Sequence, residues 1–526
     1  MNKIIGFLIT KENKLPKVDF FDVGIKVIII KHNNYNVYLW GGGDMENYKI
    51  DNKYSLSFPI KDDLLDRNVL ISFENGNIIV ENDWLGSIPV FYNSKENIIS
   101  TLSNFCLKDK TINNEGLSNF CEFGYSVFEQ TMFEDVKFMR YYSKLIISNK
   151  IEVEYKKDPV LVDSFLENES SEDEVIDLIQ VYISDVESKI NGDIVLPTSG
   201  GYDSRILNYF IKDKDRIRSF TYGISKDQSK SSEVVYAKKI SEIYNTKWKQ
   251  IELKEYNKYM DKWADIYGFS THLHGMYHIE FYTEICKNHN ILKPSLLSGV
   301  IGDAWAEEDK IENIEDHKEL VKLGYTHGMS LDLKFLNLKS DNKFKKEYFK
   351  KISRLLKEDA IKTVFAMRTK LILISYLTQI PEYFGMPVWT PFLNFKIVKA
   401  ILNISGNRRK NRVWQKDFFA KVGLNLEDMD LKSVKSNKLD YEIAKNAKLE
   451  KIDTDVMKKY ICKKRLIEIN KILSKISFYE KIKNQLLYIP KVSGILRRLG
   501  FKNKYLEVLN NYYIIKSIEK SLKYVN

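Results

Sequence analysis

The chain of 526 residues contains few cysteines, and none of them is paired in a motif. The four cysteines are Cys106, Cys121, Cys286 and Cys462, and no two of them have the CxxC spacing of a structural zinc site or a redox pair. This usage excludes a disulfide framework and favours a reducing compartment, so we expect a cytoplasmic protein. The first residues also lack the apolar stretch and cleavage site of a signal peptide.

Long hydrophobic runs are missing as well. No uncharged apolar segment approaches the roughly 18 residues of a transmembrane helix, and runs such as 27–30 and 371–377 suit buried strands or helices. Hydrophobic residues make up 44% and charged residues 29% of the chain, which are ordinary values for globular proteins. The length predicts two or three domains at about 150 residues each.

The net charge of +11 is spread along most of the chain and becomes denser between Lys458 and Lys504. A basic tail of this kind can contact RNA, an anionic membrane or an acidic partner. However, Leu, Ile and Tyr interleave with the basic residues at helical spacing, which favours a solvated helix face. We therefore expect a basic helical extension over residues 446–526 that binds no nucleic acid.

Short β-rich runs dominate residues 1–160. Clusters of Asn, Asp and Gly separate these runs, which predicts an antiparallel, sheet-rich domain. The predicted strands cover residues 23–30, 36–40, 69–73, 77–80 and 145–147. Gly41, Gly42 and Gly43 lack the Lys-Ser/Thr that follows a phosphate loop, so they are predicted to form a turn.

From residue 165 onward, strands and helices alternate. Ser171 and Glu174 form a capping box that predicts the start of a helix. Three strands with two helices between them are predicted next, at residues 193–198, 203–210, 220–223, 233–244 and 248–253. This βαβ alternation predicts a parallel sheet and an α/β domain over residues 165–445, mostly helical after residue 310.

Ser199, Gly200 and Gly201 join the first of these strands to its helix. Small residues let backbone amides approach a ligand closely, and a helix N-terminus favours phosphate. Ser199 and Ser204 add hydroxyl groups, and Asp203 suits a magnesium ion held beside phosphate. The alternative is a plain glycine turn, which the combined pattern of Ser-Gly-Gly with Asp and Ser disfavours.

This SGGYDS segment resembles the pyrophosphate loop of the N-type ATP pyrophosphatases, specifically of asparagine synthetase-like proteins. The resemblance implies a Mg²⁺- and ATP-dependent step in which a carboxylate attacks the α-phosphate and pyrophosphate leaves. LSGVIGD, at 297–303, resembles the family's SGxGxDE segment, which makes Asp303 the second magnesium ligand beside Asp203. Lys438 falls where the family has a catalytic lysine. The implied ATP-binding residues are Leu196, Ser199, Gly200, Gly201, Asp203, Ser204, Thr221, Tyr222, Gly223, Ser298 and Gly299.

The resemblance extends to the N-terminal half. Residues 83–92 resemble the D-x-x-G-x-x-P-L-Y-Y segment of the family's glutaminase domain, and residues 131–136 resemble its T-x-F-x-x-I segment. This implies an α+β domain of the Ntn-hydrolase type over residues 1–160. The family's glutaminase uses an N-terminal cysteine, whereas this sequence begins Met1-Asn2. We therefore expect a degenerate domain without glutamine hydrolysis.

Three positions depart from the family's pattern. Val300 and Ala304 stand where the family has acidic residues, and Asn394 replaces the aspartate of its PFLD segment. An aspartate pocket is therefore not expected, and free asparagine is a poor candidate for the product. The segment with His272, His274 and Tyr277 lies between two ATP-site segments and is predicted to line the acceptor pocket. Metal ligation and ordinary packing of these histidines are the alternatives.

The sequence therefore predicts an ATP-dependent ligase that forms an amide on a carboxylate-bearing small molecule, sugar or peptide. Ammonia or an amine would come from outside its own first domain. The alternative is a catalytically lapsed nucleotide-binding scaffold in surface-glycan or peptide biosynthesis. A third hypothesis, an RNA-modifying ATP pyrophosphatase, lacks the paired cysteines that such thiolation enzymes need. A protein partner or a homodimer remains open.

Overall fold

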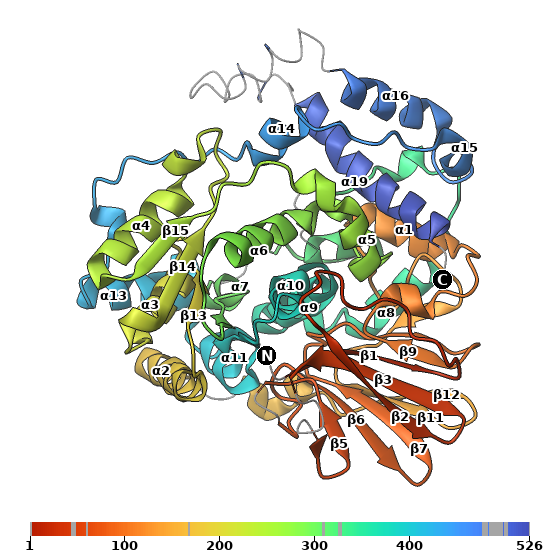
Figure 1. The fold of residues 1–526 in the computed structure, drawn as a ribbon, viewed down its shortest axis with the longest axis horizontal. Helices are drawn as coiled ribbons and strands as arrows, with labels where there is room; N and C mark the ends of the chain where they lie inside the picture. Colours follow the sequence, from red (N-terminus) through yellow and green to blue (C-terminus); the bar gives the residue numbers. More distant parts are fainter. Residues whose placement is uncertain are drawn as a thin grey trace.

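The computed structural model describes residues 3–43, 49–58, 61–166, 169–307, 311–324, 329–475 and 503–524, together with residues 482, 486 and 498. Met1 and Asn2, where the N-terminal nucleophile was considered, lie outside the described residues. So does most of 476–502 in the basic extension. The described chain forms an antiparallel β half, an α/β half and a set of C-terminal helices (Figure 1).

The first half contains two antiparallel six-stranded sheets. One sheet has the order β10-β8-β9-β1-β3-β2 and the other β12-β11-β7-β6-β5-β4. The first consists of β1 (Lys3–Thr10), β2 (Lys26–His32), β3 (Tyr35–Gly42), β8 (Phe91–Asn93), β9 (Ile98–Ser100) and β10 (Val136–Phe138). The second consists of β4 (Lys49–Ile50), β5 (Lys53–Ser55), β6 (Val69–Glu74), β7 (Asn77–Asn82), β11 (Ser143–Ile147) and β12 (Ile151–Tyr155).

The two sheets share one apolar core. Phe7 and Val37 from the first sheet pack in one cluster with Ile71 and Leu145 from the second. β1 and β3 are buried along their whole length, because their other face packs on the remainder of the protein. Helix α1 (Asn114–Phe123) lies beside these sheets. The five predicted strands are confirmed as β2, β3, β6, β7 and β11.

The prediction of a turn at the triple glycine is wrong for two of its residues. Gly41 and Gly42 belong to β3, and Gly42 pairs with Lys3 at the start of β1. A Cβ atom at Gly41 would lie 1.9 Å from the Lys3 carbonyl oxygen. Glycine is required here by the close approach of two strands, not by a reversal of the chain.

The α/β half has a parallel sheet, as predicted, and it contains two strands, β16 and β17, beyond the three that were predicted. Its order is β15-β14-β13-β16-β17, with β13 (Ile194–Pro197), β14 (Ile217–Thr221), β15 (Lys247–Gln250), β16 (Ser295–Leu297) and β17 (Val388–Trp389). The chain builds the sheet outward from β13 to β15 and then returns to place β16 on the other side of β13. The loops after β13 and β16 therefore diverge at a topological switch point, where ligands bind in open α/β sheets.

Helices flank this sheet and make up most of the chain that follows it. The predicted helices are confirmed as α2 (Glu172–Lys189), α3 (Tyr202–Phe210) and α4 (Ser232–Tyr244). The Ser171 side chain caps α2 by accepting a hydrogen bond from Glu174 N at 3.1 Å. The others are α5 (Met260–Tyr267), α6 (Tyr277–Asn288), α7 (Gly302–Ala306), α8 (Lys343–Ile352), α9 (Asp359–Ile374), α10 (Tyr376–Tyr383), α11 (Phe395–Leu402), α12 (Gly406–Arg409), α13 (Val413–Lys421), α14 (Leu439–Ala444), α15 (Thr454–Met457), α16 (Lys463–Ser474) and α19 (Lys504–Lys523).

Buried polar contacts join the two halves. Arg368 in α9 forms hydrogen bonds of 2.7 and 2.8 Å with Asp158, and its guanidinium also donates to the Trp84 carbonyl. Glu382 in α10 binds Arg67 and Lys3 from the β half. Each of these contacts joins a residue of the β half to a helix of the α/β half, so the two halves pack together as one structure. In the described part of the chain, no helix combines the length and apolar character needed to cross a bilayer.

Candidate functional site

The loop from Ser199 to Ser204 connects β13 to α3 at the centre of the sheet. Gly200 has φ = +80°, a left-handed conformation that favours glycine, and a Cβ there would lie 2.2 Å from Tyr236 Cβ. Gly201 is the N-cap of α3 and has no side chain to cap the helix, while its own N donates to Ser199 Oγ at 3.4 Å. The first-turn amides of α3 therefore remain available to an anion at the carboxyl end of β13.

Hydrogen bonds within the loop set its shape. Ser204 Oγ accepts from Ser199 N at 3.3 Å and donates to the Gly201 carbonyl at 3.1 Å. Arg205 donates to the Gly200 carbonyl at 2.9 Å and forms a bidentate ion pair with Glu427, at 2.9 and 3.0 Å. The Arg205 side chain is fully buried, so the loop is anchored from behind by a rigid contact.

Asp203 meets the second predicted acidic segment across the switch point. A Cβ at Gly299 would lie 2.9 Å from Asp203 Cβ, and one at Gly302 would lie 2.7 Å from Asp203 Cγ. Both glycines follow β16, so this loop closes directly onto α3. The structure thus brings Asp203 together with Gly299 and Asp303, as the sequence predicted.

The two carboxylates differ in their surroundings. The Asp203 side chain is half-buried, and its Oδ1 is buried with no hydrogen-bond partner among the described residues. The Asp303 side chain is 62% exposed and lies 3.9 Å from Arg412 Nη2. Burial raises the pKa of Asp203 from its usual 3.8 to about 7, and the negative charge of Asp303 adds to this shift. A buried carboxylate with an unpartnered oxygen is a strong mark of a functional site.

Backbone strain occurs in the same loop. Ile301, the N-cap of α7, has φ = +58°, a left-handed conformation that is rare for a β-branched residue. The turn is held by hydrogen bonds from Gly302 N to the Gly299 carbonyl and from Ala304 N to the Ile301 carbonyl. Strain of this kind persists where the surrounding structure fixes a functional geometry.

Two residues beside the carboxylates were missed by the sequence analysis. Arg412 directly precedes α13, and its Nε donates to Glu307 at 3.2 Å. Gln415 in α13 is 1% exposed. Both Gln415 and Arg412 lower the pKa of Asp203, against the effect of burial. The only sequence signal was the basic run at residues 408–412, which spacing alone does not connect to β13.

The donor set fits a magnesium ion bound together with phosphate. Within the described ranges, no group of three or more His, Cys, Asp and Glu side chains is arranged to hold a metal. Magnesium usually takes one or two carboxylates and completes its shell with water and substrate phosphates. Asp203 and Asp303 supply two hard oxygen ligands, and the unpartnered Asp203 Oδ1 is consistent with a cation there.

The other residues that were predicted to bind the nucleotide differ in their burial and in their contacts. Leu196 is fully buried, so only its backbone can face a ligand. Thr221 ties the sheet together, because its hydroxyl donates to the Thr198 carbonyl and accepts from Trp248 Nε1 at 3.0 Å. The Tyr222 ring packs on Tyr277, with ring centroids 5.7 Å apart.

Glycine is needed at position 223, and Ser298 shapes the loop after β16. A Cβ at Gly223 would lie 2.1 Å from the Gln228 carbonyl oxygen. Ser298 N donates to the Trp389 carbonyl, and Ser298 Oγ accepts from Val300 N at 3.2 Å. Asn394, the departure in the PFLD-like segment, caps α11 by accepting from Ile397 N at 3.2 Å.

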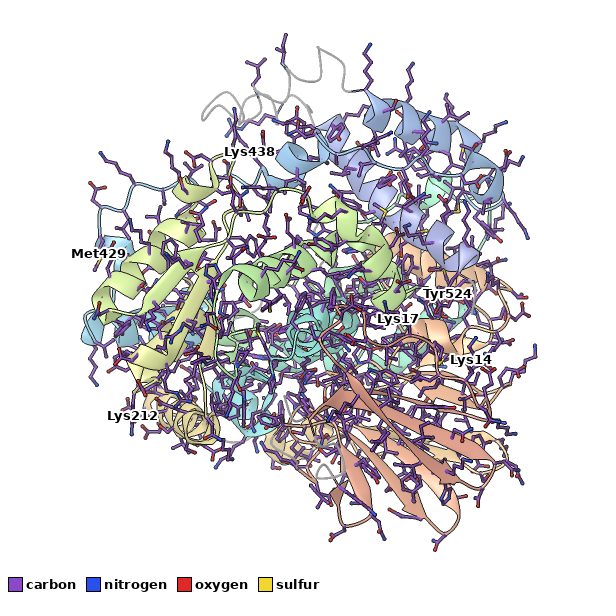
Figure 2. All side chains as sticks on the ribbon, viewed as in Figure 1. Lys14, Lys17, Lys212, Met429, Lys438 and Tyr524 are labelled. Atoms are coloured by element: carbon purple, nitrogen blue, oxygen red, sulfur yellow. The ribbon has the colours of Figure 1, made fainter. Side chains whose placement is uncertain are left out.

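Lys438 lies at the β14–β15 end of the sheet's carboxyl edge (Figure 2). Its backbone N donates to the Ile224 carbonyl at 2.7 Å, just after the loop that carries Tyr222. The side chain lines a hollow of about 800 Å³ with Ser225, Gln250 and Ser436. Burial lowers the pKa of the Lys438 ammonium, and the charge of Lys226 lowers it further.

The predicted acceptor segment lies at one end of α6. His274 belongs to the 3-10 helix η8 (Leu273–Met276) rather than to α6, so it does not share a helix with His278. His274 Nε2 lies 3.0 and 3.1 Å from the two carboxylate oxygens of Asp440. His272 Nδ1 accepts from His274 N at 3.2 Å, and Tyr277 OH lies 3.1 Å from Tyr376 OH. Asp440 was not predicted.

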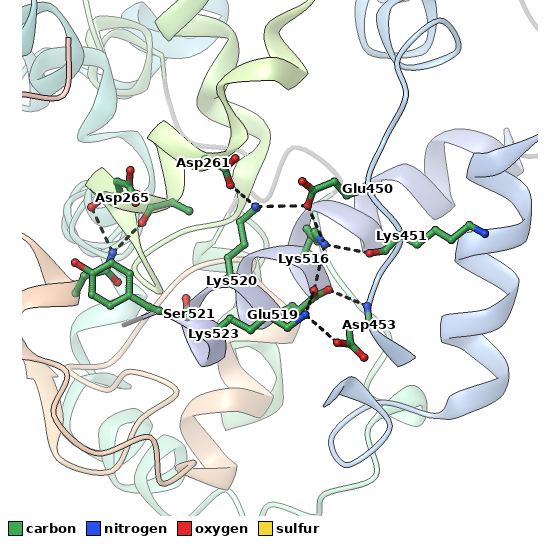
Figure 3. A pocket seen from close by; sticks show the side chains of 13 residues that line it. Asp261, Asp265, Glu450, Lys451, Asp453, Lys516, Glu519, Lys520, Ser521 and Lys523 are labelled. Carbon is green, nitrogen blue, oxygen red and sulfur yellow. Dashed lines mark hydrogen bonds and ion pairs between the residues drawn. The ribbon is translucent and has the colours of Figure 1, made fainter. Parts of the chain in front are cut away.

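A pocket of about 570 Å³ lies between α5 and α19 (Figure 3). Its charged side chains neutralise one another: Lys523 lies 2.9 Å from Asp453, Lys516 lies 3.2 Å from Glu519, and Lys520 pairs with Asp261. These contacts explain how the C-terminal helix docks on the protein. Because the charges are mutually paired, this pocket is a weaker candidate for a ligand site than the switch point.

Two comparisons with known proteins found no match. No model of a protein family matches the sequence, and no curated protein matches it either.

Proposed function

We propose that this protein is an ATP-dependent ligase that activates a carboxylate by adenylation, with release of pyrophosphate, and joins it to an amine. The observation that carries the proposal is the meeting of Asp203 and Asp303 beside the uncapped N-terminus of α3, at the switch point of a parallel sheet. This arrangement is consistent with the SGGYDS resemblance to asparagine synthetase-like proteins. The antiparallel half would then be the degenerate glutaminase-like domain.

Each part of the site has a chemical task in this reaction. The backbone amides of Gly200 to Ser204 would bind the pyrophosphate oxygens, and Arg205 keeps their loop in place. Asp203 and Asp303 would hold a magnesium ion, which when bound neutralises charge on the departing pyrophosphate. Arg412 lies beside these carboxylates and would add a positive charge there. Lys438 would stabilise charge on the activated group from the other end of the edge.

The cysteines support an external source of nitrogen. Cys106 and Cys121, the two cysteines of the N-terminal half, are buried, and burial raises the pKa of both thiols far above the usual value. A thiol with a raised pKa is a poor nucleophile, because the thiolate is the reactive form. We therefore propose that ammonia or an amine reaches the site from outside the N-terminal half.

The test is cleavage of magnesium-ATP by the purified full-length chain. AMP and pyrophosphate are measured against a panel of carboxylates: aspartate, uronic acids and their nucleotide-linked forms, and a short acidic peptide. Asp203→Ala is expected to abolish AMP release. Asp213→Ala is the matched control, because Asp213 is an exposed aspartate beyond the other end of α3.

AMP and pyrophosphate with one carboxylate would support adenylation and identify the substrate class. ATP that binds but stays intact with every carboxylate would instead support the nucleotide-binding scaffold. Absence of ATP binding would contradict the role assigned to Ser199–Ser204. Unchanged turnover in Asp203→Ala would remove the magnesium assignment.

A further inference from the structure

His274, Asp440 and Tyr256 form a hydrogen-bonded cluster outside the carboxylate site. The Asp440 carboxylate faces His274 Nε2 at 3.0 and 3.1 Å and accepts from the Tyr256 hydroxyl at 2.6 Å. The side chains of His274 and Asp440 are 17% and 21% exposed, so both are in partial contact with solvent. Three segments far apart in the sequence build the cluster: the 3-10 helix η7 (Tyr256–Tyr259), η8 and α14.

The contact with Asp440 orients the imidazole of His274. A carboxylate accepts hydrogen bonds, so Nε2 carries the proton and Nδ1 of the neutral ring has a free lone pair. In the part of the chain that the structure describes, Nδ1 makes no hydrogen bond. This is the arrangement of a general base that a carboxylate holds in one tautomer.

Other groups facing His274 are aromatic or neutral. The rings of Tyr277, Tyr513 and His272 have centroids 5.3, 6.1 and 6.1 Å from that of His274. Burial lowers the pKa of the nearby His278 to about 3, so this second imidazole carries no charge at neutral pH. Asp440 is therefore the charged group in contact with the His274 ring among the described residues.

The cluster lies next to Lys438 and Tyr222, two residues of the proposed nucleotide site. Asp440 is two residues after Lys438, and both Lys438 N and Leu439 N donate to the Ile224 carbonyl. On the other side, the Tyr277 ring lies between Tyr222 and His274, with centroids 5.7 and 5.3 Å away. The same short segments therefore hold the nucleotide-facing residues and the imidazole.

We propose that His274, oriented by Asp440, is the general base that takes a proton from the amine nucleophile. This inference rests on the proposed ligase function. In the step, the amine nitrogen forms a bond to the carbonyl carbon of the adenylated carboxylate, and the bond from that carbon to the phosphate oxygen breaks. AMP leaves with the electron pair, and the proton from nitrogen moves to Nδ1 of His274. Tyr256 positions Asp440 and does not touch the reacting atoms.

The experiment compares two nucleophiles in the full-length protein, using the carboxylate that supports AMP release. Ammonium must lose one proton before it can attack and a second as the amide forms. Hydroxylamine is already uncharged at neutral pH, loses only the second of these protons, and is nucleophilic enough to trap activated carboxylates without help from a base. His274→Gln is expected to slow amide formation by at least about 10²-fold, the usual contribution of a general base. It should leave hydroxamate formation almost unchanged, which also shows that the variant is folded.

Two further variants sharpen the test. Asp440→Asn should slow amide formation without slowing hydroxamate formation, because an amide side chain no longer fixes the tautomer. His317→Gln is the matched control, since His317 also contacts an aspartate, with Nδ1 3.1 Å from Asp316, but it lies in the distant 3-10 helix η9 (His317–Leu323).

The outcomes separate this inference from the ligase proposal. Equal loss of amide and hydroxamate in His274→Gln would overturn the role as base and leave the ligase intact. Unchanged amide formation would overturn it as well. Absence of hydroxamate with the unsubstituted protein would overturn both.

Discussion

Glu382 is a buried carboxylate and Asp203 a half-buried one with a buried Oδ1, and their environments are opposite. Burial alone would raise the pKa of Glu382, but the charges of Arg67 and Lys3 outweigh this effect and lower it below the usual value. Arg67 binds Glu382 through two hydrogen bonds of 2.7 and 3.0 Å. Asp203 has no such cations in contact, faces another carboxylate, and has its pKa raised to about 7.

This difference distinguishes a charge that holds the fold together from a charge that is available to bind a ligand or to react. A buried charge whose partners complete its hydrogen bonds joins two parts of a fold and leaves nothing for a ligand. A buried charge with an unpartnered oxygen lowers stability and is retained where it binds or reacts. Four predictions test this distinction.

The largest expected effect is on stability at Glu382. Glu382→Gln should lower the free energy of unfolding by about 3–5 kcal/mol, because Arg67 and Lys3 remain buried opposite an uncharged partner. Urea denaturation measures the change. The control is Asp62→Asn, which removes an ion pair with Lys53 at 2.8 Å whose side chains are 31% and 45% exposed. This variant should change stability by about 0–1 kcal/mol, and equal effects would contradict the comparison.

Gly302→Ala should perturb Asp203 from the neighbouring loop. The new Cβ would lie 2.7 Å from Asp203 Cγ and 2.8 Å from Phe392 Cε2, so overpacking should lower stability by about 1–3 kcal/mol. ATP cleavage should fall in parallel. Gly201→Ala is the matched variant in the same site, because its Cβ would meet only Ser199 Oγ, at 3.4 Å. Thermal melting measures the stability of both variants. A larger loss of stability in Gly201→Ala than in Gly302→Ala would contradict the close contact between the loop of Gly302 and Asp203.

Asp203 should give stability an unusual dependence on pH in metal-free protein. Its folded pKa of about 7 exceeds its usual 3.8, so between these values the folded protein holds a proton that the unfolded chain has lost. The free energy of unfolding should therefore decrease as pH rises through this window, by about 1.4 kcal/mol for each unit of pKa difference.

The contribution is isolated by comparing the protein with Asp203→Asn in chelator-treated buffer, since the asparagine cannot titrate. The variant should be the more stable of the two at pH 8, and the difference should vanish near pH 4. A difference that is constant with pH would contradict the raised pKa.

The smallest expected effect concerns Asp303. Asp303→Asn removes the negative charge that adds to the shift in the pKa of Asp203, but it leaves the burial unchanged. The pH window measured above should therefore move to lower pH and remain above the usual value for an aspartate. A window that does not move would mean that burial acts alone.

Most of the fold followed from local patterns in the sequence. Alternating runs predicted β2, β3, β6, β7 and β11, and the βαβ alternation predicted the order of elements from α2 to β15. The triple glycine was misassigned because the need for Gly41 comes from a strand more than thirty residues away in sequence, at Lys3. The sequence predicted that the chain is mostly helical after residue 310, but it did not predict which parts of the protein these helices contact.

For the candidate site, the sequence identified the residues on the two loops after β13 and β16. It missed Arg412 and Gln415, because each reaches the site from an element more than a hundred residues away and no local spacing marks it. It missed Asp440 although Lys438 is two residues away, because the partner of Asp440, His274, is 166 residues away in sequence. Glu382 was missed for the same reason, since its partners lie in the other half of the chain.

By itself, the sequence determined the strand-turn-helix at Ser199–Ser204 with Asp203 on it, because short-range preferences for turns and helix starts are encoded locally. Asp303 came from the resemblance of residues 297–303 to a family segment. Only the tertiary structure decided that the carboxylate of Glu382 has hydrogen-bond partners whereas Asp203 has a buried oxygen without one. The reason is physical: a pKa depends on burial and on the charges in contact, and both are set by which distant segments the fold brings together.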